Sequence, residues 1–243
     1  MKFTSELIQA RFLKRYKRFF ADVQITTPEG TQTVTAHCPN TGSMRHCTVA
    51  DSECWISKSD NPKRKLKYTL EAVTAEHGGM AGVNTGLTNK LVKEALQNKW
   101  IAELSGYDEL ASEVKYGEQN SRLDFRLSSS EQHCYVEVKN VTLGLEEKLG
   151  AFPDAVTARG RKHLHELAYA VSEGHRAVLL FCVQHTDIDR LGLAWNIDPQ
   201  YCETLVNVMS QGLEVLAYGV SMRPHAFQVD RRIEFSAERF SCD

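Results

Sequence analysis

The sequence predicts an α+β protein of two domains: a small N-terminal β-barrel followed by an α/β domain with a mixed sheet. Three observations support this expectation. Short apolar segments separated by turn residues fill residues 1–83. Helix-length and strand-length apolar patterns alternate over residues 84–243. Glycines cluster near the junction of the two regions, and 243 residues are enough for two domains with these bounds.

The N-terminal region is expected to form a five-stranded barrel of the OB type. Apolar residues mark strands near residues 8–13, 19–25, 34–36, 55–56 and 68–73. Turn residues, including Pro28-Glu29-Gly30 and Asn61-Pro62, separate these strands. Five short strands in a barrel fit a region of this length. Such barrels often bind nucleic acids, although a fold alone does not establish a function.

The C-terminal region begins with a helical pattern and then mixes strands with helices. Helices are expected at residues 89–104, 154–172 and 198–211. Strands are expected at residues 109–116, 121–127, 134–141, 176–183 and 213–220. The predicted order is a helix, three strands, and then helix–strand–helix–strand. This order predicts an α/β domain with a mixed sheet.

Composition excludes several classes of protein. Apolar residues make up 42% and charged residues 25% of the chain, which argues against a disordered protein. The longest apolar run, Ala177–Val183, is strand-sized and falls short of the ~20 residues that cross a bilayer. The N-terminus has no hydrophobic signal-peptide core, so we expect a cytoplasmic protein without membrane contact. Seven cysteines without a C-x-x-C pair favour reduced thiols.

Charge is distributed unevenly between the two regions. Residues 1–83 carry 12 Lys and Arg against 8 Asp and Glu, whereas residues 84–243 carry 17 against 23. A basic segment beside an acidic one is expected of a phosphate-binding module next to a site that contains carboxylates. Ordinary surface variation is the alternative.

Two carboxylates and a lysine form the candidate catalytic group. Asp124 lies in a short predicted strand, and twelve residues separate it from Glu137 in Glu137-Val138-Lys139. Alternate side chains share one face of a strand, so Glu137 and Lys139 point the same way, and a hairpin would bring Asp124 to them. Glu113, on the preceding predicted strand, is a further candidate carboxylate.

This residue set has a definite chemistry. Carboxylate oxygens bind Mg²⁺, which lowers the pKa of a bound water and offsets charge on a phosphate. Lys139 would position that water or stabilise the developing charge. The set Glu113, Asp124, Glu137 and Lys139 resembles the Asp…Glu-x-Lys core of PD-(D/E)XK nucleases, with the three carboxylates as metal ligands. The alternative is a solvated strand face, because Glu-x-Lys alone occurs on many half-exposed strands.

Basic residues follow the Glu-x-Lys strand on the next predicted helix. Arg159 and Lys162 are three residues apart, share a face, and are candidate phosphate ligands. Arg161 and His165 are expected on the solvated face instead.

The N-terminal region supplies further candidate nucleic-acid ligands. They are Arg11, Lys14, Arg15, Arg18, Arg45, Lys63, Arg64, Lys65 and Lys67. The interleaved aromatics, such as Phe12 and Phe19, are expected in the barrel core. The turn at residues 37–45 is rich in Gly, Ser and Thr, which suits a phosphate or an ordinary tight turn. The cysteines near His46 match no common zinc spacing.

Several ordered motifs resemble the bacterial sugar fermentation stimulation protein A family. They are residues 37–44, Cys54-Trp55-Ile56-Ser57, residues 61–68, Gly82-Val83-Asn84-Thr85, residues 135–143 and residues 151–160. Thr88 stands where the family is expected to have a proline. The resemblance implies an OB-like domain, a PD-(D/E)XK nuclease-like domain, non-specific DNA binding through the phosphate backbone and a regulatory role in maltose and other sugar metabolism.

Three hypotheses about function stay open at this point. The first is a DNA-binding protein that grips phosphates with its basic N-terminal module. The second is an active Mg²⁺-dependent nuclease. The third is a regulator that binds a small effector or partner on a nuclease-derived scaffold. Strandedness, sequence preference and oligomeric state are not encoded in any motif.

Overall fold

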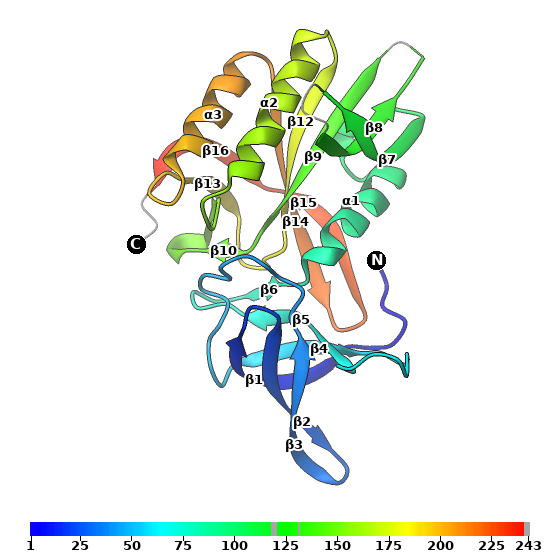
Figure 1. Ribbon diagram of the computed structural model, residues 1–243, viewed down its shortest axis with the longest axis vertical. Helices are drawn as coiled ribbons and strands as arrows, with labels where there is room; N and C mark the ends of the chain where they lie inside the picture. Colours follow the sequence, from blue (N-terminus) through cyan, green and yellow to red (C-terminus); the bar gives the residue numbers. More distant parts are fainter. Residues whose placement is uncertain (118–120, 131, 241–243) are drawn as a thin grey trace.

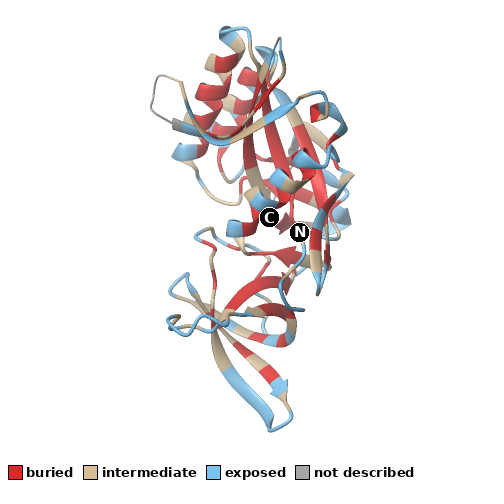
Figure 2. Cartoon of the chain, turned by 90° about the vertical axis from the view of Figure 1, so that its right-hand side faces the viewer, coloured by how far each residue is buried: buried red, intermediate tan, exposed pale blue. Residues whose placement is uncertain are grey.

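The computed structural model describes residues 1–117, 121–130 and 132–240 and contains the two expected folding units. Figure 1 shows the barrel at the bottom and the α/β unit above it. Figure 2 shows buried residues concentrated in the strands of both units. The predicted fold class, an OB barrel followed by an α/β domain with mixed sheets, is confirmed.

The barrel is built from the strands that the sequence predicts, plus a short sixth strand. They are β1 (Ile8–Tyr16), β2 (Phe20–Thr27), β3 (Gly30–His37), β4 (Glu53–Lys58), β5 (Tyr68–Thr74) and β6 (Met80–Gly82). Their order is β3-β2-β1-β4-β5-β6, and a parallel β3–β5 pairing closes the barrel. Phe12, Val23, Ile56 and Leu70 fill its interior because alternate residues of each strand point inward.

The second unit is a six-stranded mixed sheet with helices on both faces (Figure 1). Its strand order is β15-β14-β12-β9-β8-β7. The strands are β7 (Glu109–Tyr116), β8 (Ser121–Ser128), β9 (His133–Val141), β12 (Arg176–Val183), β14 (Glu214–Arg223) and β15 (Ala226–Arg232). β9, β12 and β14 run parallel, whereas the outer pairings are antiparallel. Both faces of β12 are buried, as its continuous apolar sequence predicts.

Three helices cover this sheet. Helix α1 (Thr88–Gln97) packs on one face, and helices α2 (Ala158–Ser172) and α3 (Pro199–Ser210) pack on the other. Two helices are shorter than predicted. Residues 102–104 form a separate 3-10 turn, and α2 begins only after Thr157, whose hydroxyl accepts a hydrogen bond from the Gly160 amide as an N-cap.

A second, four-stranded sheet was not predicted. It consists of β10 (Leu143–Gly144), β11 (Leu149–Phe152), β13 (Arg190–Ala194) and β16 (Glu234–Phe240). β15 was also missed. Three of its four strands, β10, β11 and β13, have five or fewer residues and are too short for a clear period of two.

The two units contact each other through the start of the chain and through the loop between β3 and β4. The Phe3 amide donates to the His225 carbonyl at 3.0 Å, so the first residues lie on the second unit. In the loop, Ser43 Oγ donates to Asp154 and Cys47 Sγ to the Thr142 carbonyl. The surface of the second unit at Thr142 and Asp154 therefore contacts a barrel loop.

Two sequence expectations about chain class can be compared with this fold. The six described cysteines are free and buried. Burial raises the pKa of Cys47 to about 12 despite the hydrogen bond to Thr142, so its thiol stays protonated. Among the described residues, no helix has the length and apolar character needed to cross a membrane.

Candidate active site

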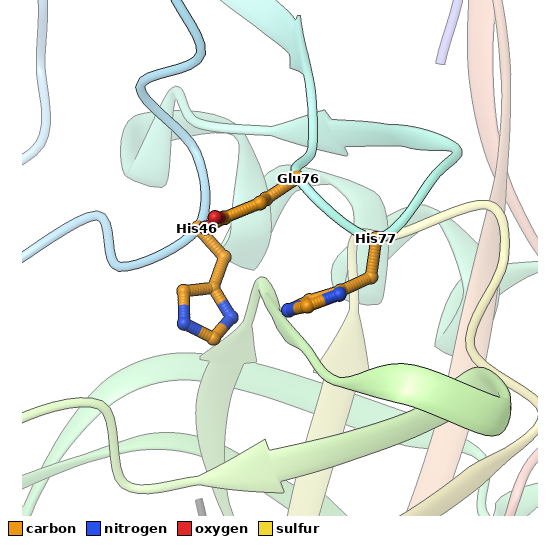
Figure 3. Close-up of side chains that lie close together, drawn as sticks. All are labelled: His46, Glu76 and His77. Atoms are coloured by element: carbon orange, nitrogen blue, oxygen red, sulfur yellow. The ribbon is translucent and has the colours of Figure 1, made fainter. Parts of the chain in front are cut away.

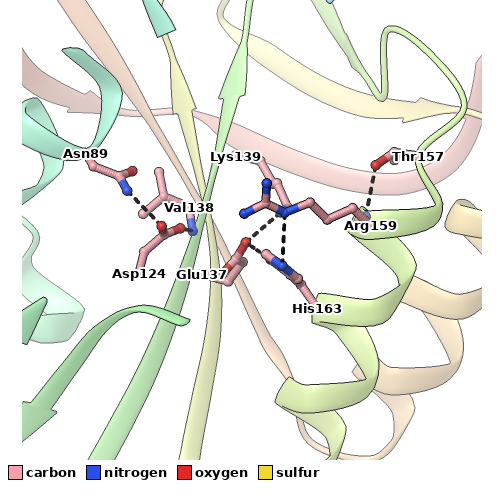
Figure 4. A network of polar contacts seen from close by, with 9 residues as sticks. Asn89, Asp124, Glu137, Val138, Lys139, Thr157, Arg159 and His163 are labelled. Atoms are coloured by element: carbon pink, nitrogen blue, oxygen red, sulfur yellow. Dashed lines mark hydrogen bonds and ion pairs between the residues drawn. The ribbon is translucent and has the colours of Figure 1, made fainter. Parts of the chain in front are cut away.

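Asp124 lies where strand β8 separates from β9. Regular pairing of the two strands ends at Phe125 and Val136, and beyond it Asp124 Oδ2 accepts a hydrogen bond from the Val138 amide at 2.8 Å. Leu123 and Phe125 are two residues apart yet are buried in the core layers on opposite faces of the sheet. This irregularity turns the Asp124 carboxylate toward the end of β9. Asn89 of α1 holds its other oxygen at 2.7 Å (Figure 4).

Glu137 lies on β9 with only 2% of its surface exposed. Its Oε1 accepts hydrogen bonds from Lys139 Nζ at 2.6 Å and from His163 Nδ1 (Figure 4). Its Oε2 is buried and has no hydrogen-bond partner among the described residues. A buried carboxylate oxygen without a partner is costly, and such an oxygen can accept from a cation or a water.

The two carboxylates are shifted in opposite directions. Burial raises the pKa of Asp124 to about 6, and the negative charge of Glu137 adds to the effect, against the hydrogen bonds from Val138 and Asn89. Burial also raises the pKa of Glu137, but the His163 hydrogen bond and the charge of Lys139 outweigh it, so this pKa is below its ordinary value. Glu137 is therefore the carboxyl group that ionises more readily, and its negative charge disfavours ionisation of Asp124.

An open cavity of about 210 Å³ lies beside this group. Its walls include Asp124, Glu137, Lys139, Arg159 and His163. Asn89, Asn140, Thr85 and Thr88 add neutral hydrogen-bonding groups to the rim. A cavity with two carboxylates, a lysine and an arginine can take a phosphate group together with a cation.

The donor set fits a hard divalent cation. Mg²⁺ and Ca²⁺ prefer carboxylate oxygens and are commonly held by one or two carboxylates. Asp124 and Glu137 both line one cavity. The charge of Glu137 raises the pKa of Asp124, and a cation between the two carboxylates would offset this repulsion.

His163 is the residue that sequence reasoning missed. It lies on α2, is 7% exposed, and donates from Nδ1 to Glu137. Arg159 Nε donates to its Nε2 at 3.4 Å, and this hydrogen bond requires a lone pair on Nε2. The chain Arg159–His163–Glu137 links a cavity-lining cation to the carboxylate. A spacing of 26 residues between His163 and Glu137 gave no sequence signal.

His163→Ala is expected to weaken Mg²⁺ or Ca²⁺ binding by about 10–100-fold, the usual effect of losing a partner that orients a metal ligand. Without the imidazole hydrogen bond, burial raises the pKa of Glu137, so the loss is larger at low pH. Calorimetric titration between about pH 5 and about pH 8 measures it. His165→Ala, on the exposed side of α2, is the matched control. An unchanged pH profile of binding in His163→Ala would contradict the role.

Glu113 does not join the carboxylate group. It is exposed on the edge strand β7 at a left-handed backbone position (φ 54°), and it does not line the cavity. The prediction placed it by strand order alone. Strand order cannot show that the backbone at this residue leaves the regular extended conformation.

The basic residues of α2 divide differently from the prediction. Arg159 lines the cavity as expected. Lys162 is half-buried on the same helix and does not line the cavity. Arg161, expected on the wet face, instead contacts buried Asp198 at 3.3 Å, and Asp198 caps α3. Arg161 thus ties the start of α2 to the start of α3.

Some N-terminal candidates are occupied by contacts within the barrel. The Arg15 guanidinium donates to the carbonyls of Arg18, Asn40, Gly42 and Ser43, so it orders the β3–β4 loop. Arg11 pairs with Asp51 at 2.7 Å in a hollow that Glu53 also lines. Two other candidates also have partners: Lys14 lies 3.7 Å from Asp22, and Arg64 donates to Thr69.

The remaining candidates are exposed. They are Arg18, Arg45, Lys63, Lys65 and Lys67. Phe19, expected in the core, is 44% exposed next to Arg18, because the left-handed Lys17 and Arg18 turn it outward between β1 and β2. Phe12 is buried as expected.

Comparison with known proteins now identifies the family. The family described as "SfsA N-terminal OB domain" matches residues 13–83, and "Sugar fermentation stimulation protein RE domain" matches residues 86–226. The sugar fermentation stimulation protein homolog of Saccharophagus degradans is 52% identical over 222 residues, which cover 91% of this chain and 94% of that protein. The homolog from a Marinomonas species is 50% identical over 234 residues, covering 96% of this chain and 89% of that protein.

A solved structure of SfsA from Pyrococcus furiosus has the same fold. It superposes with a TM-score of 0.84 at 24% identity, and the match covers 97% of this chain and 98% of that one. Matches to both domains and identities of about half over most of the chain confirm the family resemblance. The chain belongs to the sugar fermentation stimulation protein family.

Proposed function

We propose that the chain binds DNA through its phosphate backbone and that its second domain hydrolyses phosphodiester bonds with a divalent cation. The observation that carries this proposal is that Asp124, Glu137 and Lys139 line one open cavity. The solved SfsA from Pyrococcus furiosus is a complex with Ca²⁺, which supports a divalent cation for the family.

The residues of the cavity divide the chemistry among them. Asp124 and Glu137 would hold Mg²⁺, which supplies an activated water and neutralises charge on the phosphate. Lys139 hydrogen-bonds a carboxylate oxygen and, from the same position, stabilises negative charge on a phosphoryl oxygen. Arg159 reaches the cavity from the start of α2 and offers a fork of donors to a non-bridging phosphate oxygen. His163 keeps Glu137 ionised.

The exposed cations of the barrel would guide the polyanion. Lys63, Lys65 and Lys67 alternate along the segment before β5, and Arg18 and Arg45 lie on neighbouring loops. Arg15 fixes the loop that includes Arg45, so it shapes this surface without contacting a phosphate itself. Backbone contacts of this kind bind DNA without sequence preference.

Binding without cleavage is the second candidate. It is favoured by the Lys139–Glu137 pair, because the carboxylate 2.6 Å away offsets part of the ammonium charge that would stabilise a phosphate. A role in regulating maltose and other sugar metabolism remains a prediction from the family resemblance.

A cleavage assay separates the two candidates. Full-length protein is incubated with single-stranded and double-stranded DNA and RNA, with Mg²⁺, Mn²⁺ or EDTA. Products that need the cation and vanish in Glu137→Gln support hydrolysis. Binding of DNA with no products from any substrate supports the second candidate and overturns the first.

Replacing Lys63, Lys65 and Lys67 together with alanine is expected to weaken DNA binding and flatten its salt dependence. Each lost phosphate contact lowers the slope of log K against log salt by about 0.9 for duplex DNA, so the triple variant should lose about 2–3 from the slope. Fluorescence anisotropy over a salt series measures it. Lys93→Ala with Lys99→Ala removes exposed lysines of the other domain and is the control. An affinity unaffected by salt in the parent protein would refute phosphate binding.

A further inference from the structure

Three potential metal ligands meet at a second place, away from the catalytic carboxylates. His46 comes from the loop between β3 and β4, and Glu76 and His77 come from the turn between β5 and β6 (Figure 3). One ligand atom from each lies within 4.8 Å of the others. Their rings and carboxylate gather where the barrel meets strand β10 of the second domain, since His46 contacts Gly144.

The backbone holds these ligands in place from several sides. The Glu76 amide donates to the His46 carbonyl at 2.8 Å, which ties the turn to the loop. Beyond the turn, Met80 and Thr186 exchange hydrogen bonds at 2.9 and 3.0 Å, which fixes the turn against the second domain. His46 has a left-handed backbone (φ 57°), an uncommon conformation that sets the direction of its side chain.

The His46 hydrogen bond leaves one ring nitrogen free. Its Nδ1 lies 2.9 Å from the Gly144 carbonyl oxygen, which can only accept. Nδ1 is therefore the protonated nitrogen, and Nε2 presents its lone pair. Metal-binding histidines are commonly oriented in this way by a carbonyl on the other ring nitrogen. The His77 ring lies edge-on to it, with centroids 4.8 Å apart.

The chemistry of the set selects the class of ion. Two imidazoles and a carboxylate suit Zn²⁺ and related transition metals, whereas Mg²⁺ and Ca²⁺ prefer all-oxygen sites. Bonds of about 2.0–2.2 Å require the ligand atoms to approach a little closer than they do here. Glu76 and His77 are exposed and can make this adjustment. Three protein ligands leave one tetrahedral position for water.

We propose that His46, Glu76 and His77 form a Zn²⁺-type site that fastens the β3–β4 loop to the β5–β6 turn at the junction of the two domains. The ion would bind the two barrel segments to each other, and the His46–Gly144 hydrogen bond would extend the link to the second domain. The same loop includes three residues whose carbonyls accept from Arg15, namely Asn40, Gly42 and Ser43. Ser43 also contacts Asp154. Metal binding would thus stiffen the surface between barrel and cavity.

Zinc titration of metal-stripped protein tests the site. The titration uses ZnCl₂ and calorimetry, in the Glu137→Gln background, so that ions held by the catalytic carboxylates do not contribute. His77→Ala and His46→Ala are each expected to lower the affinity for one equivalent of zinc by at least about tenfold. Loss of a residue that only orients a metal ligand already lowers metal affinity by about this factor. His225→Ala, an exposed histidine outside the group, should bind zinc as the parent does.

Two results would overturn the proposal. The first is equal zinc stoichiometry and affinity in His77→Ala and its parent. The second concerns the location of the effect, measured by hydrogen exchange. Zinc is expected to slow exchange at residues 44–47 and 75–79, and protection confined to other segments would place the ion elsewhere. Neither readout depends on DNA binding or cleavage, so this test stands apart from that of the proposed function.

Discussion

Lys139→Ala is expected to lower metal-dependent cleavage by about 10²–10³-fold, the usual cost of removing one group that stabilises transition-state charge. The side chain lies in the cavity and is 15% exposed, and its ammonium group is 2.6 Å from Glu137. Its removal leaves both carboxylates in place, so Mg²⁺ or Ca²⁺ should still bind. Initial cleavage rates at saturating metal, together with calorimetric metal affinity, measure the two effects separately.

The comparison with Glu137→Gln makes this prediction specific. Glu137→Gln should lose metal binding together with cleavage, because one ligand is neutralised. Lys93→Ala, an exposed lysine on α1, should behave as the parent protein. If Lys139→Ala cleaved at the parent rate, the lysine would have no part in the chemistry. If it lost metal affinity as severely as Glu137→Gln, its role would be structural.

Asp124→Asn is expected to stabilise the metal-free protein at about pH 8 while abolishing cleavage. Burial, with the charge of Glu137, raises the pKa of Asp124 from 3.8 to about 6. The folded state therefore binds a proton more tightly than the unfolded state, and stability is lost as pH rises from about 4 through about 6. The shift corresponds to roughly 2–3 kcal/mol above that window. Asparagine cannot ionise and avoids this loss.

The hydrogen bonds of Asp124 can survive this substitution. An asparagine oxygen can accept from the Val138 amide, and Asn89 can rotate its amide to accept from the new NH₂ group. Thermal unfolding in EDTA should show a Tm higher by about 4–8 °C at about pH 8 and little difference at about pH 4. Asp60→Asn, at an exposed position, is the control. An equal or lower Tm at about pH 8 would show that Asp124 is not under electrostatic strain.

The predictions for Lys139→Ala and Asp124→Asn both depend on the charges that the cavity brings together. Carboxylates that bind a cation are destabilising when the cation is absent, because they repel each other in a partly buried cavity. Added Mg²⁺ or Ca²⁺ should therefore raise the Tm of the parent protein more than that of Asp124→Asn. The carboxylates that the proposed chemistry needs therefore lower the stability of the metal-free protein.

The sequence was sufficient for features that depend on neighbours along the chain. Strand period, turn residues and apolar runs predicted the barrel, the mixed sheet and strand β12 within its observed bounds. The pairing of β8 with β9 and the shared face of Glu137 and Lys139 also followed, whereas Asp124 reaches them through an irregularity beyond the last regular pair. Periodicity carries this information because it is a property of local backbone geometry.

Only the tertiary structure decided which partner each polar side chain takes. His163 reaches Glu137 because α2 packs over β9. Arg15 binds the carbonyls of a loop, and Arg161 pairs with the carboxylate that caps a helix. Glu113 is exposed to solvent. The same is true of His46, Glu76 and His77, which two separate turns bring together. Such pairings depend on how distant elements pack and on small departures from regular backbone, and neither leaves a repeating pattern in the order of residues.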